Sequence, residues 1–215
     1  MKEVLSLDEL RKVSLADRHT FQKFFQNMPE PIADATFTMR YIWSEPMRHS
    51  WKIINNNLCV FGFLRNKHVM WGPPLGSNKL PETIAAGFET VERLNEEEGI
   101  AAAPAIVYIP ESLKSTYEKI AKHHGYYLPY WTQDYVYNTD DLVQLSGKNY
   151  KSKRRELNIF LRNNKAQVES LDFDKHAEEC FTLLETWHKQ KQQNLNGTYS
   201  YELAAEATAA KALIS

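Results

Sequence analysis

The stretch WKIINNNLCVFGFLRNKHVMW (residues 51–71) decides the fold, because it holds three strand-like runs separated by two turn signals. The runs are rich in aromatic and β-branched residues, and they are Trp51–Ile54, Leu58–Leu64 and His68–Trp71. The triplets between them, Asn55-Asn56-Asn57 and Arg65-Asn66-Lys67, are typical of tight turns. This pattern predicts an antiparallel meander, which we extend back to Thr36–Trp43 because that segment has a similar composition.

Helices and further strands are predicted on both sides of the meander. Hydrophobic residues at roughly helical spacing predict a helix within residues 15–27, ending before Pro29. After the rigid Gly72–Gly76 loop we expect a helix at 80–98, a buried strand at Ala105–Ile109, a helix near 111–123 and a strand at Gln133–Tyr137. This order predicts one α+β (or α/β) lobe over about residues 1–138, with a mixed or antiparallel sheet.

Residues 139–215 have a mainly helical pattern. Helices are expected at 147–164, 174–193 and 200–213, with one short strand at Ala166–Leu171. The last two helices have apolar faces formed by Ala177, Phe181, Leu184 and His188, with Trp187 beside them, and by Leu203, Ala207, Ala210 and Leu213/Ile214. Leaving such faces in water costs several kcal/mol at about 25 cal/mol per Å². We therefore expect them to pack on the first lobe, to self-associate with another chain, or to stay partly ordered.

Positive charge is concentrated in SGKNYKSKRRELNIFLRNNK (residues 146–165), which carries seven cations and one anion. The segment sums to +6 and the whole chain to -1, so the remainder sums to -7. On a helix with about 100° per residue, Lys148, Lys151, Arg155 and Arg162 fall within about 60° of arc. Four apolar residues fall on the opposite side, namely Tyr150, Leu157, Phe160 and Leu161. We expect this helix to bury the apolar stripe and to expose the cations.

Such a row of cations is typical of a surface that binds phosphates of tRNA or of an anionic lipid head group. The candidate site residues are Lys148, Lys151, Lys153, Arg154 and Arg155. The alternative is a solvated helix face that only aids solubility. Aromatic residues just upstream are able to stack on bases or to fill a core, and both interpretations stay open for Tyr126, Tyr127, Tyr130, Trp131, Tyr135 and Tyr137.

Composition excludes several classes of protein. Hydrophobic residues make up 43% of the chain and charged residues 25%, as in an ordinary soluble globular protein. A net charge of -1 argues against general polyanion binding by the whole chain, so a nucleic-acid role requires a local patch. The two isolated cysteines, Cys59 and Cys180, fit a reducing compartment. The longest uncharged stretches run 12 residues, whereas a membrane span needs about 20, so we expect a cytoplasmic protein without a transmembrane segment.

Motifs for nucleotide and metal chemistry are missing from the sequence. It has neither GxxxxGK[ST] nor GxGxxG, so a glycine-rich phosphate loop is not predicted, and no GxSxG nucleophile motif occurs. His176 and Cys180 are spaced as a possible metal pair on a predicted helix, but two ligands are too few for a zinc site. We therefore predict no metal and no cofactor, and we assign no catalytic residue.

Three segments together resemble a known family. ATFTMRYIW (residues 35–43), WGPPLG (71–76) and DYVYNTDDLVQLSGKNYKSKRRELNIF (134–160) are similar to the domain of unknown function 2156, which is also the C-terminal catalytic domain of phosphatidylglycerol lysyltransferases. The resemblance implies two tandem acyltransferase lobes of the GNAT type. It also implies transfer of an aminoacyl group from aminoacyl-tRNA to an amine or hydroxyl acceptor, such as a lipid.

The resemblance assigns residues 1–138 to the first GNAT-like lobe and residues 139–215 to the helical start of an incomplete second lobe. We therefore expect an aminoacyltransferase-like protein that is inactive on its own. The alternatives are a non-catalytic module that binds tRNA or another anion, and an acyl-CoA-dependent N-acyltransferase. The GNAT pyrophosphate turn [RQ]xxGx[GA] is absent, which counts against the latter.

Overall fold

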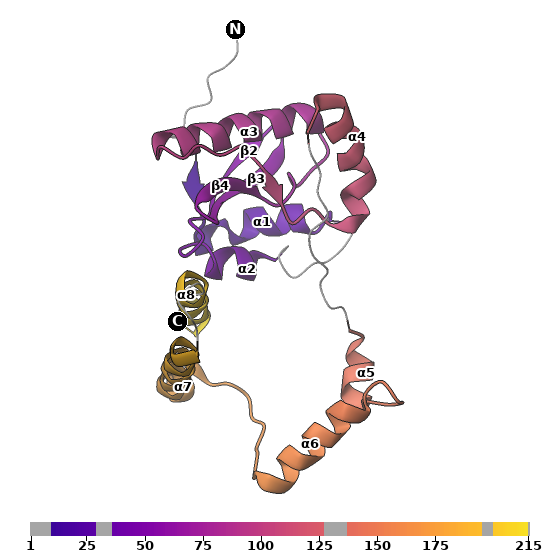
Figure 1. Cartoon of the computed structure of the whole chain (residues 1–215), viewed down its shortest axis with the longest axis vertical. Coiled ribbons are helices and arrows are strands. Elements are labelled where there is room, and N and C mark those ends of the chain that lie inside the picture. Colours follow the sequence, from indigo (N-terminus) through magenta and orange to yellow (C-terminus); the bar gives the residue numbers. More distant parts are fainter. Residues whose placement is uncertain (1–9, 29–35, 127–136, 195–199, 215) are drawn as a thin grey trace. The chain divides into compact units, whose positions relative to one another are not determined.

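The computed structural model describes residues 10–28, 36–126, 137–194 and 200–214 (Figure 1). The chain divides into two compact units, one formed by residues 1–127 together with 174–215 (unit 1) and the other by residues 128–173 (unit 2). These units do not follow the predicted boundary at residue 138, because the last two helices group with the N-terminal lobe. The assignment of residues 139–215 to an incomplete second lobe stays a prediction.

Unit 1 is built on a mixed five-stranded sheet with the order β1-β2-β3-β4-β5. The strands are β1 (Arg11–Lys12), β2 (Ser50–Ile54), β3 (Asn57–Leu64), β4 (Lys67–Trp71) and β5 (Ile106–Val107). Neighbouring strands are antiparallel except for β4 and β5, which are parallel. The α+β class and the meander over β2–β4 are confirmed, whereas β1 was not predicted.

Two tight hairpins set the register of this meander. Ile54 pairs with Asn57 across the first turn, and Leu64 pairs with Lys67 across the second. The residues inside both turns have positive φ, with values of 49° and 62° in the first and 50° and 61° in the second. Two such residues in a two-residue loop form a type I′ turn, whose twist matches that of paired strands. The predicted turn triplets are therefore confirmed.

Helices cover both faces of the sheet. The α-helices of unit 1 are α1 (Arg18–Phe25), α2 (Phe37–Ile42), α3 (Leu80–Glu97), α4 (Lys114–His124), α7 (Phe173–Asn194) and α8 (Ser200–Ile214). Two short 3-10 helices, η2 (Leu15–Asp17) and η4 (Glu111–Leu113), directly precede α1 and α4. In Figure 1, α3 crosses one face, and α1 and α2 lie against the other.

Alternate strand residues enter two separate cores, because successive side chains of a strand point to opposite faces. In β3, Leu58 and Val60 join the core on the side of α1 and α2. Cys59 and Phe61 join the core on the side of α3. The strands β2 and β4 alternate in the same way, so the central sheet is buried on both faces.

The buried side chain of Asn57 fastens the first hairpin to the segment that follows the Gly72–Gly76 loop. Its amide nitrogen donates to the Asn78 carbonyl oxygen at 2.7 Å and to the Thr83 hydroxyl at 2.9 Å. Leu58 and Leu75 exchange two main-chain hydrogen bonds of 3.1 and 2.9 Å beside it. Gly76 has a φ of +135°, and a Cβ atom there would collide with the Asn57 amide oxygen.

The segment Thr36–Trp43 is a helix, so its prediction as part of the meander was wrong. Thr36 caps α2, because its hydroxyl accepts a hydrogen bond from the Met39 main-chain nitrogen at 3.3 Å. The helix buries Phe37 against the aromatic core, where its ring lies 5.6 Å from that of Phe21. Tertiary packing thus overrides the strand preference of the composition.

The two C-terminal helices pack within unit 1, which was one of the predicted alternatives. The predicted apolar face of α7, including Phe181, Leu184 and Trp187, is half-buried. In α8 the buried residues are Leu203, Ala205 and Ala209, and Ala205 belongs to the core on the side of α1 and α2. Leu213 is exposed, so the buried face of α8 is rotated relative to the predicted one.

Unit 2 contains α5 (Thr139–Gln144) and α6 (Lys151–Asn163). The helix α5 was not predicted, and α6 starts four residues later than expected. The predicted strand Ala166–Leu171 is wrong, because these residues have no regular secondary structure. Most of the predicted strand Gln133–Tyr137 lies outside the described residues.

Replacing Gly76 by alanine should destabilise unit 1 more than replacing Gly99 by alanine. Gly99 also has a positive φ, of 69°, but a Cβ atom there would have open space around it. Gly99→Ala carries only the backbone strain of about 1–2 kcal/mol. Gly76→Ala also displaces Asn57 and its buried hydrogen bonds, which adds about 1–3 kcal/mol. Urea unfolding of both variants measures the difference. Equal free energies of unfolding would contradict the role given to Asn57.

Candidate functional site

The structure places four of the five predicted site residues on the first turns of α6, namely Lys151, Lys153, Arg154 and Arg155. Lys148 precedes the helix in a turn that follows Gly147, whose φ is +77°, so its predicted position on the helix was wrong. Within α6, Lys151, Arg155 and Arg162 are spaced by four and seven residues and share one exposed side.

Two of these cations already have partners. The ammonium of Lys153 lies 3.0 Å from the Glu156 carboxylate and helps to lower the pKa of Glu156. The guanidinium of Arg154 donates to the main-chain carbonyl oxygens of Leu145 and Gly147, with a distance of 2.8 Å to Gly147. These carbonyls belong to the connection between α5 and α6, so Arg154 fastens that connection.

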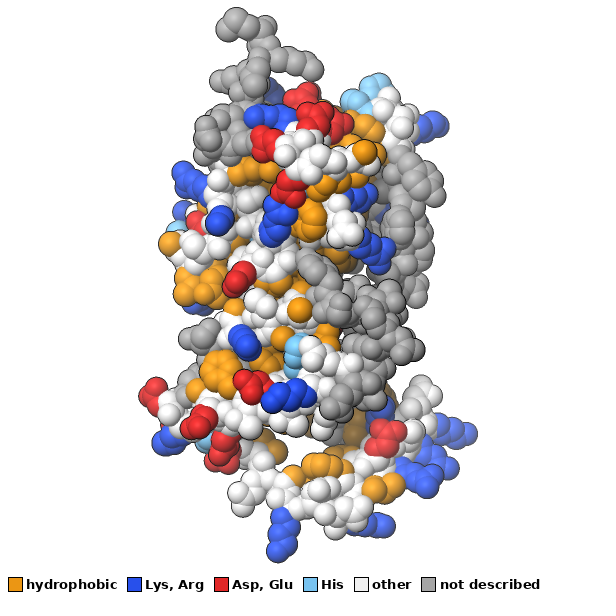
Figure 2. Space-filling view, turned by 60° about the vertical axis from the view of Figure 1, so that its left-hand side comes forward, with side chains coloured by type: hydrophobic (Ala, Val, Ile, Leu, Met, Phe, Trp, Pro, Cys, Tyr) orange, Lys and Arg blue, Asp and Glu red, His pale blue; other side chains and the backbone are white. Residues whose placement is uncertain are grey.

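The side chains of Lys151, Arg155 and Arg162 have no hydrogen-bond or ion-pair partner among the described residues. Glu156 is the only carboxylate on α6, and it is paired with Lys153. Figure 2 shows Lys and Arg side chains projecting around this helix near the bottom of the view. The sequence therefore provides a helix side whose positive charge is not neutralised locally.

The apolar stripe of α6 is not buried, which contradicts the prediction. Leu157, Phe160 and Leu161 are 45%, 50% and 55% exposed. Hydrophobic side chains lie beside the cations in Figure 2. Unit 2 thus presents a helix that is cationic on one side and apolar on the other, and both sides are open to solvent among the described residues.

The upstream aromatic residues are only partly described. The ring of Tyr126 packs against Phe88 with centroids 5.1 Å apart, which supports core packing for that residue. Tyr137 is largely exposed. The others, which are Tyr127, Tyr130, Trp131 and Tyr135, lie outside the described residues.

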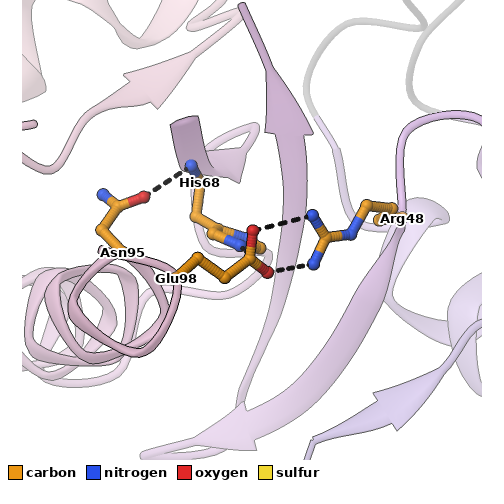
Figure 3. A network of polar contacts seen from close by, with 4 residues as sticks. All are labelled: Arg48, His68, Asn95 and Glu98. Atoms are coloured by element: carbon orange, nitrogen blue, oxygen red, sulfur yellow. Dashed lines mark hydrogen bonds and ion pairs between the residues drawn. The ribbon is translucent and has the colours of Figure 1, made fainter. Parts of the chain in front are cut away.

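A polar network in unit 1 joins segments that the sequence analysis did not connect (Figure 3). The guanidinium of Arg48 donates to both carboxylate oxygens of Glu98, at 3.1 Å to Oε2. The buried ring of His68 lies 3.0 Å from Glu98, and the main-chain nitrogen of His68 donates to Asn95 at 2.8 Å. The network holds the end of α3 against β4 and the segment before β2. Arg48 and Glu98 are fifty residues apart, so no local pattern signals their pairing.

Arg48 is the main reason that the pKa of Glu98 falls to about 2, and His68 adds a smaller effect. The carboxylate is only partly covered, so the pair is worth no more than about 1 kcal/mol. A network of this kind is typical of a structural clamp rather than of a catalytic site.

The family described as "Phosphatidylglycerol lysyltransferase, C-terminal" matches residues 25–211. The chain belongs to this family. The family resemblance that the three segments predicted is thus confirmed. A function related to that of phosphatidylglycerol lysyltransferases is supported at the level of the family. No curated protein matches the chain.

A solved structure resembles the chain over most of its length. It is a conserved protein of unknown function from Bacteroides thetaiotaomicron VPI-5482, with a TM-score of 0.71 and 20% sequence identity. The match covers 95% of this chain and 67% of that chain. At this identity the likeness shows the fold alone. Within the described part of the lysyltransferase-family chain, no helix is long and apolar enough to cross a membrane.

Replacing Glu98 by glutamine should lower stability at pH 7 by about 1 kcal/mol. The pKa of Glu98 is about 2 in the folded chain and 4.5 ordinarily, so its contribution is complete above pH 4.5 and is lost as the pH falls through about 2. The difference between wild type and Glu98→Gln should therefore shrink from pH 5 to pH 2. Urea unfolding at several pH values measures it, with the exposed neighbour Glu97→Gln as the control. A difference that is independent of pH would contradict this account.

Proposed function

We propose that the chain is an aminoacyl-tRNA-dependent aminoacyltransferase-like protein in which α6 binds the phosphates of the tRNA. The observation that carries the proposal is the exposed side formed by Lys151, Arg155 and Arg162, whose charges are not neutralised by any described residue. A tRNA backbone supplies a row of phosphates, and a protein gains affinity when its cations neutralise several of them and release their counterions. Membership of the lysyltransferase family supports a group transfer that starts from charged tRNA.

In the proposed reaction, an acceptor amine or hydroxyl attacks the aminoacyl ester, and the free tRNA leaves. Catalysis of this type rests on positioning of the two substrates and on stabilisation of the developing oxyanion. We assign α6 to the holding of tRNA and not to a chemical step. The connection fastened by Arg154 fixes the first turn of α6 relative to α5, so it orients the cations without contacting phosphate.

An anionic membrane surface is the second candidate for the same helix. The exposed side chains of Leu157, Phe160 and Leu161 favour it, because an amphipathic helix lies in a bilayer interface with its apolar side inserted and its cations near the head groups. In that case α6 would be a docking element for a lipid surface, and the chain would act as a binding module.

A double substitution tests the tRNA surface. Lys151→Glu with Arg155→Glu should weaken tRNA binding about tenfold or more, and it should reduce the slope of log affinity against log salt by roughly 1.5–2, because two phosphate contacts are lost. Fluorescence anisotropy with labelled tRNA at several salt concentrations measures both effects. The matched control is Lys119→Glu with Lys122→Glu on the exposed side of α4, which changes the total charge equally.

Equal loss in both double variants would show that net charge alone attracts tRNA, and it would contradict the assignment to α6. Sedimentation with vesicles of phosphatidylglycerol and phosphatidylcholine separates the second candidate. Leu157→Ser with Leu161→Ser should weaken vesicle binding but leave tRNA binding unchanged if α6 inserts into lipid.

A further inference from the structure

A cavity of about 400 Å³ lies on the surface of unit 1, where the end of α2 meets the two C-terminal helices. It is open to solvent, and its volume is in the range of small-molecule sites. The residues that α7 and α8 contribute are three or four positions apart within each helix, so each helix turns one side to the cavity. The apolar lining consists of Ile42, Trp43, Leu184, Trp187, Ala209 and Ala210.

Small residues on α8 leave this space open. The side chains of Ala209 and Ala210 end at Cβ, so α8 contributes little volume on the side of the cavity. The helix itself is anchored, because Leu203 and Ala205 are buried and Ala205 belongs to the core on the side of α1 and α2. The hollow is therefore bounded by an anchored helix whose small side chains do not fill it.

Two half-buried tryptophans, Trp43 and Trp187, line the cavity. Neither ring packs against another aromatic ring of the described residues. The face of a tryptophan ring is electron-rich and attracts a cation more strongly than that of tyrosine or phenylalanine. Trp187 already makes one such contact, because the ammonium of Lys191, which does not line the cavity, lies 5.7 Å from its ring centroid. The cavity thus combines two aromatic rings of the type that binds cations.

The charge of the lining also favours a cation. Glu206 is the only charged residue among the described residues that line the cavity. It is exposed, and its carboxylate forms no ion pair with a described residue. No lysine, arginine or histidine of the described part of the chain belongs to the lining. The cavity therefore repels anions, such as a fatty acid or a phosphate, and attracts a positively charged ligand.

The apolar walls select the kind of cation. A primary ammonium has three N–H donors, and those that point at the walls lose their hydrogen bonds to water. Glu206 is the only described lining side chain that accepts hydrogen bonds, because the indole nitrogen of tryptophan only donates. A quaternary ammonium has no N–H donor to leave unpaired, and its methyl groups suit aromatic and aliphatic walls. The lining therefore favours a quaternary ammonium over a primary one.

We propose that this cavity binds a small, free quaternary ammonium compound of the choline type. Trp43 and Trp187 contact its methyl groups and attract its charge, and Glu206 balances that charge at the solvent-exposed edge. The alanines of α8 leave the room that the ligand occupies. Recognition of quaternary ammonium groups by aromatic side chains is an established use of the cation–π interaction. The site consists of residues of unit 1 and does not rest on the proposed tRNA surface of α6.

Titration of the full chain with choline, followed by the NMR signals of the tryptophan indole N–H groups, tests the proposal. The chain has five tryptophans, so each indole signal is separable and is assigned by substitution. The signals of Trp43 and Trp187 should shift saturably, whereas those of the buried Trp51 and Trp71 should not. Sodium chloride at the same ionic strength is the blank. If the signals of Trp43 and Trp187 shift no more with choline than with the blank, the proposal is wrong.

A neutral analogue separates attraction of the charge from simple apolar binding. The compound 3,3-dimethyl-1-butanol has the shape of choline with carbon in place of nitrogen, and it should bind about tenfold more weakly because the cation–π and charge interactions are lost. Ethanolamine, a primary ammonium, should also bind more weakly than choline. Equal affinity for choline and for its neutral analogue would overturn the proposal. Binding to phosphatidylcholine vesicles without binding of free choline would overturn the assignment to a soluble ligand.

Substitutions of the charged and aromatic lining test the role of each group. Glu206→Gln should reduce the preference for choline over the neutral analogue, whereas Glu118→Gln on the exposed side of α4 changes the total charge equally and should not. Trp187→Phe should reduce that preference partly and Trp187→Leu more strongly, because the ring face of phenylalanine attracts a cation less than that of tryptophan. A folded Trp187→Leu variant that keeps the full preference would overturn the role of the ring.

Filling the cavity from α8 locates the site. Ala210→Leu should abolish choline binding, because the larger side chain occupies the hollow, whereas Ala204→Leu on the exposed side of the same helix should leave it unchanged. Circular dichroism and melting temperature check that each variant is folded. Choline binding that survives in a folded Ala210→Leu variant would place the ligand elsewhere and overturn the cavity site.

Discussion

The strict alternation of side chains along β2, β3 and β4 is the constraint on which unit 1 depends. Each strand sends one set of residues into the core beneath α3 and the other set into the core that contacts α1 and α2. A slip of one residue would exchange the two sets, because the side-chain period of a strand is two. The type I′ turns prevent such a slip, since each fixes the residue pair at its ends. The positions of α2 and of the Gly72–Gly76 loop follow from this register.

The sequence was sufficient to predict those elements whose structure depends on interactions between neighbouring residues. The turn triplets, the strands between them and the amphipathic helix α3 are each specified by neighbouring residues. The segment Thr36–Trp43 failed because its composition favours a strand while its burial against Phe21 and the cap at Thr36 favour a helix. Ala166–Leu171 failed because an alternation of apolar and polar residues favours a strand only weakly, and these residues have no regular secondary structure.

The candidate site was predictable in charge but not in detail. Counting cations located α6, and their spacing correctly grouped Lys151, Arg155 and Arg162. The number and spacing of the cations did not show that Arg154 forms hydrogen bonds within the chain. The main-chain carbonyls that it binds come close to its guanidinium only because the backbone turns at Gly147.

The proposed binding surface on α6 depends on the physics of exposed charge. At physiological salt the field of an exposed cation decays within about 8 Å, so affinity there depends on several contacts acting together and is sensitive to salt. Such an arrangement suits a long polyanion, because its many phosphates compensate for weak individual contacts.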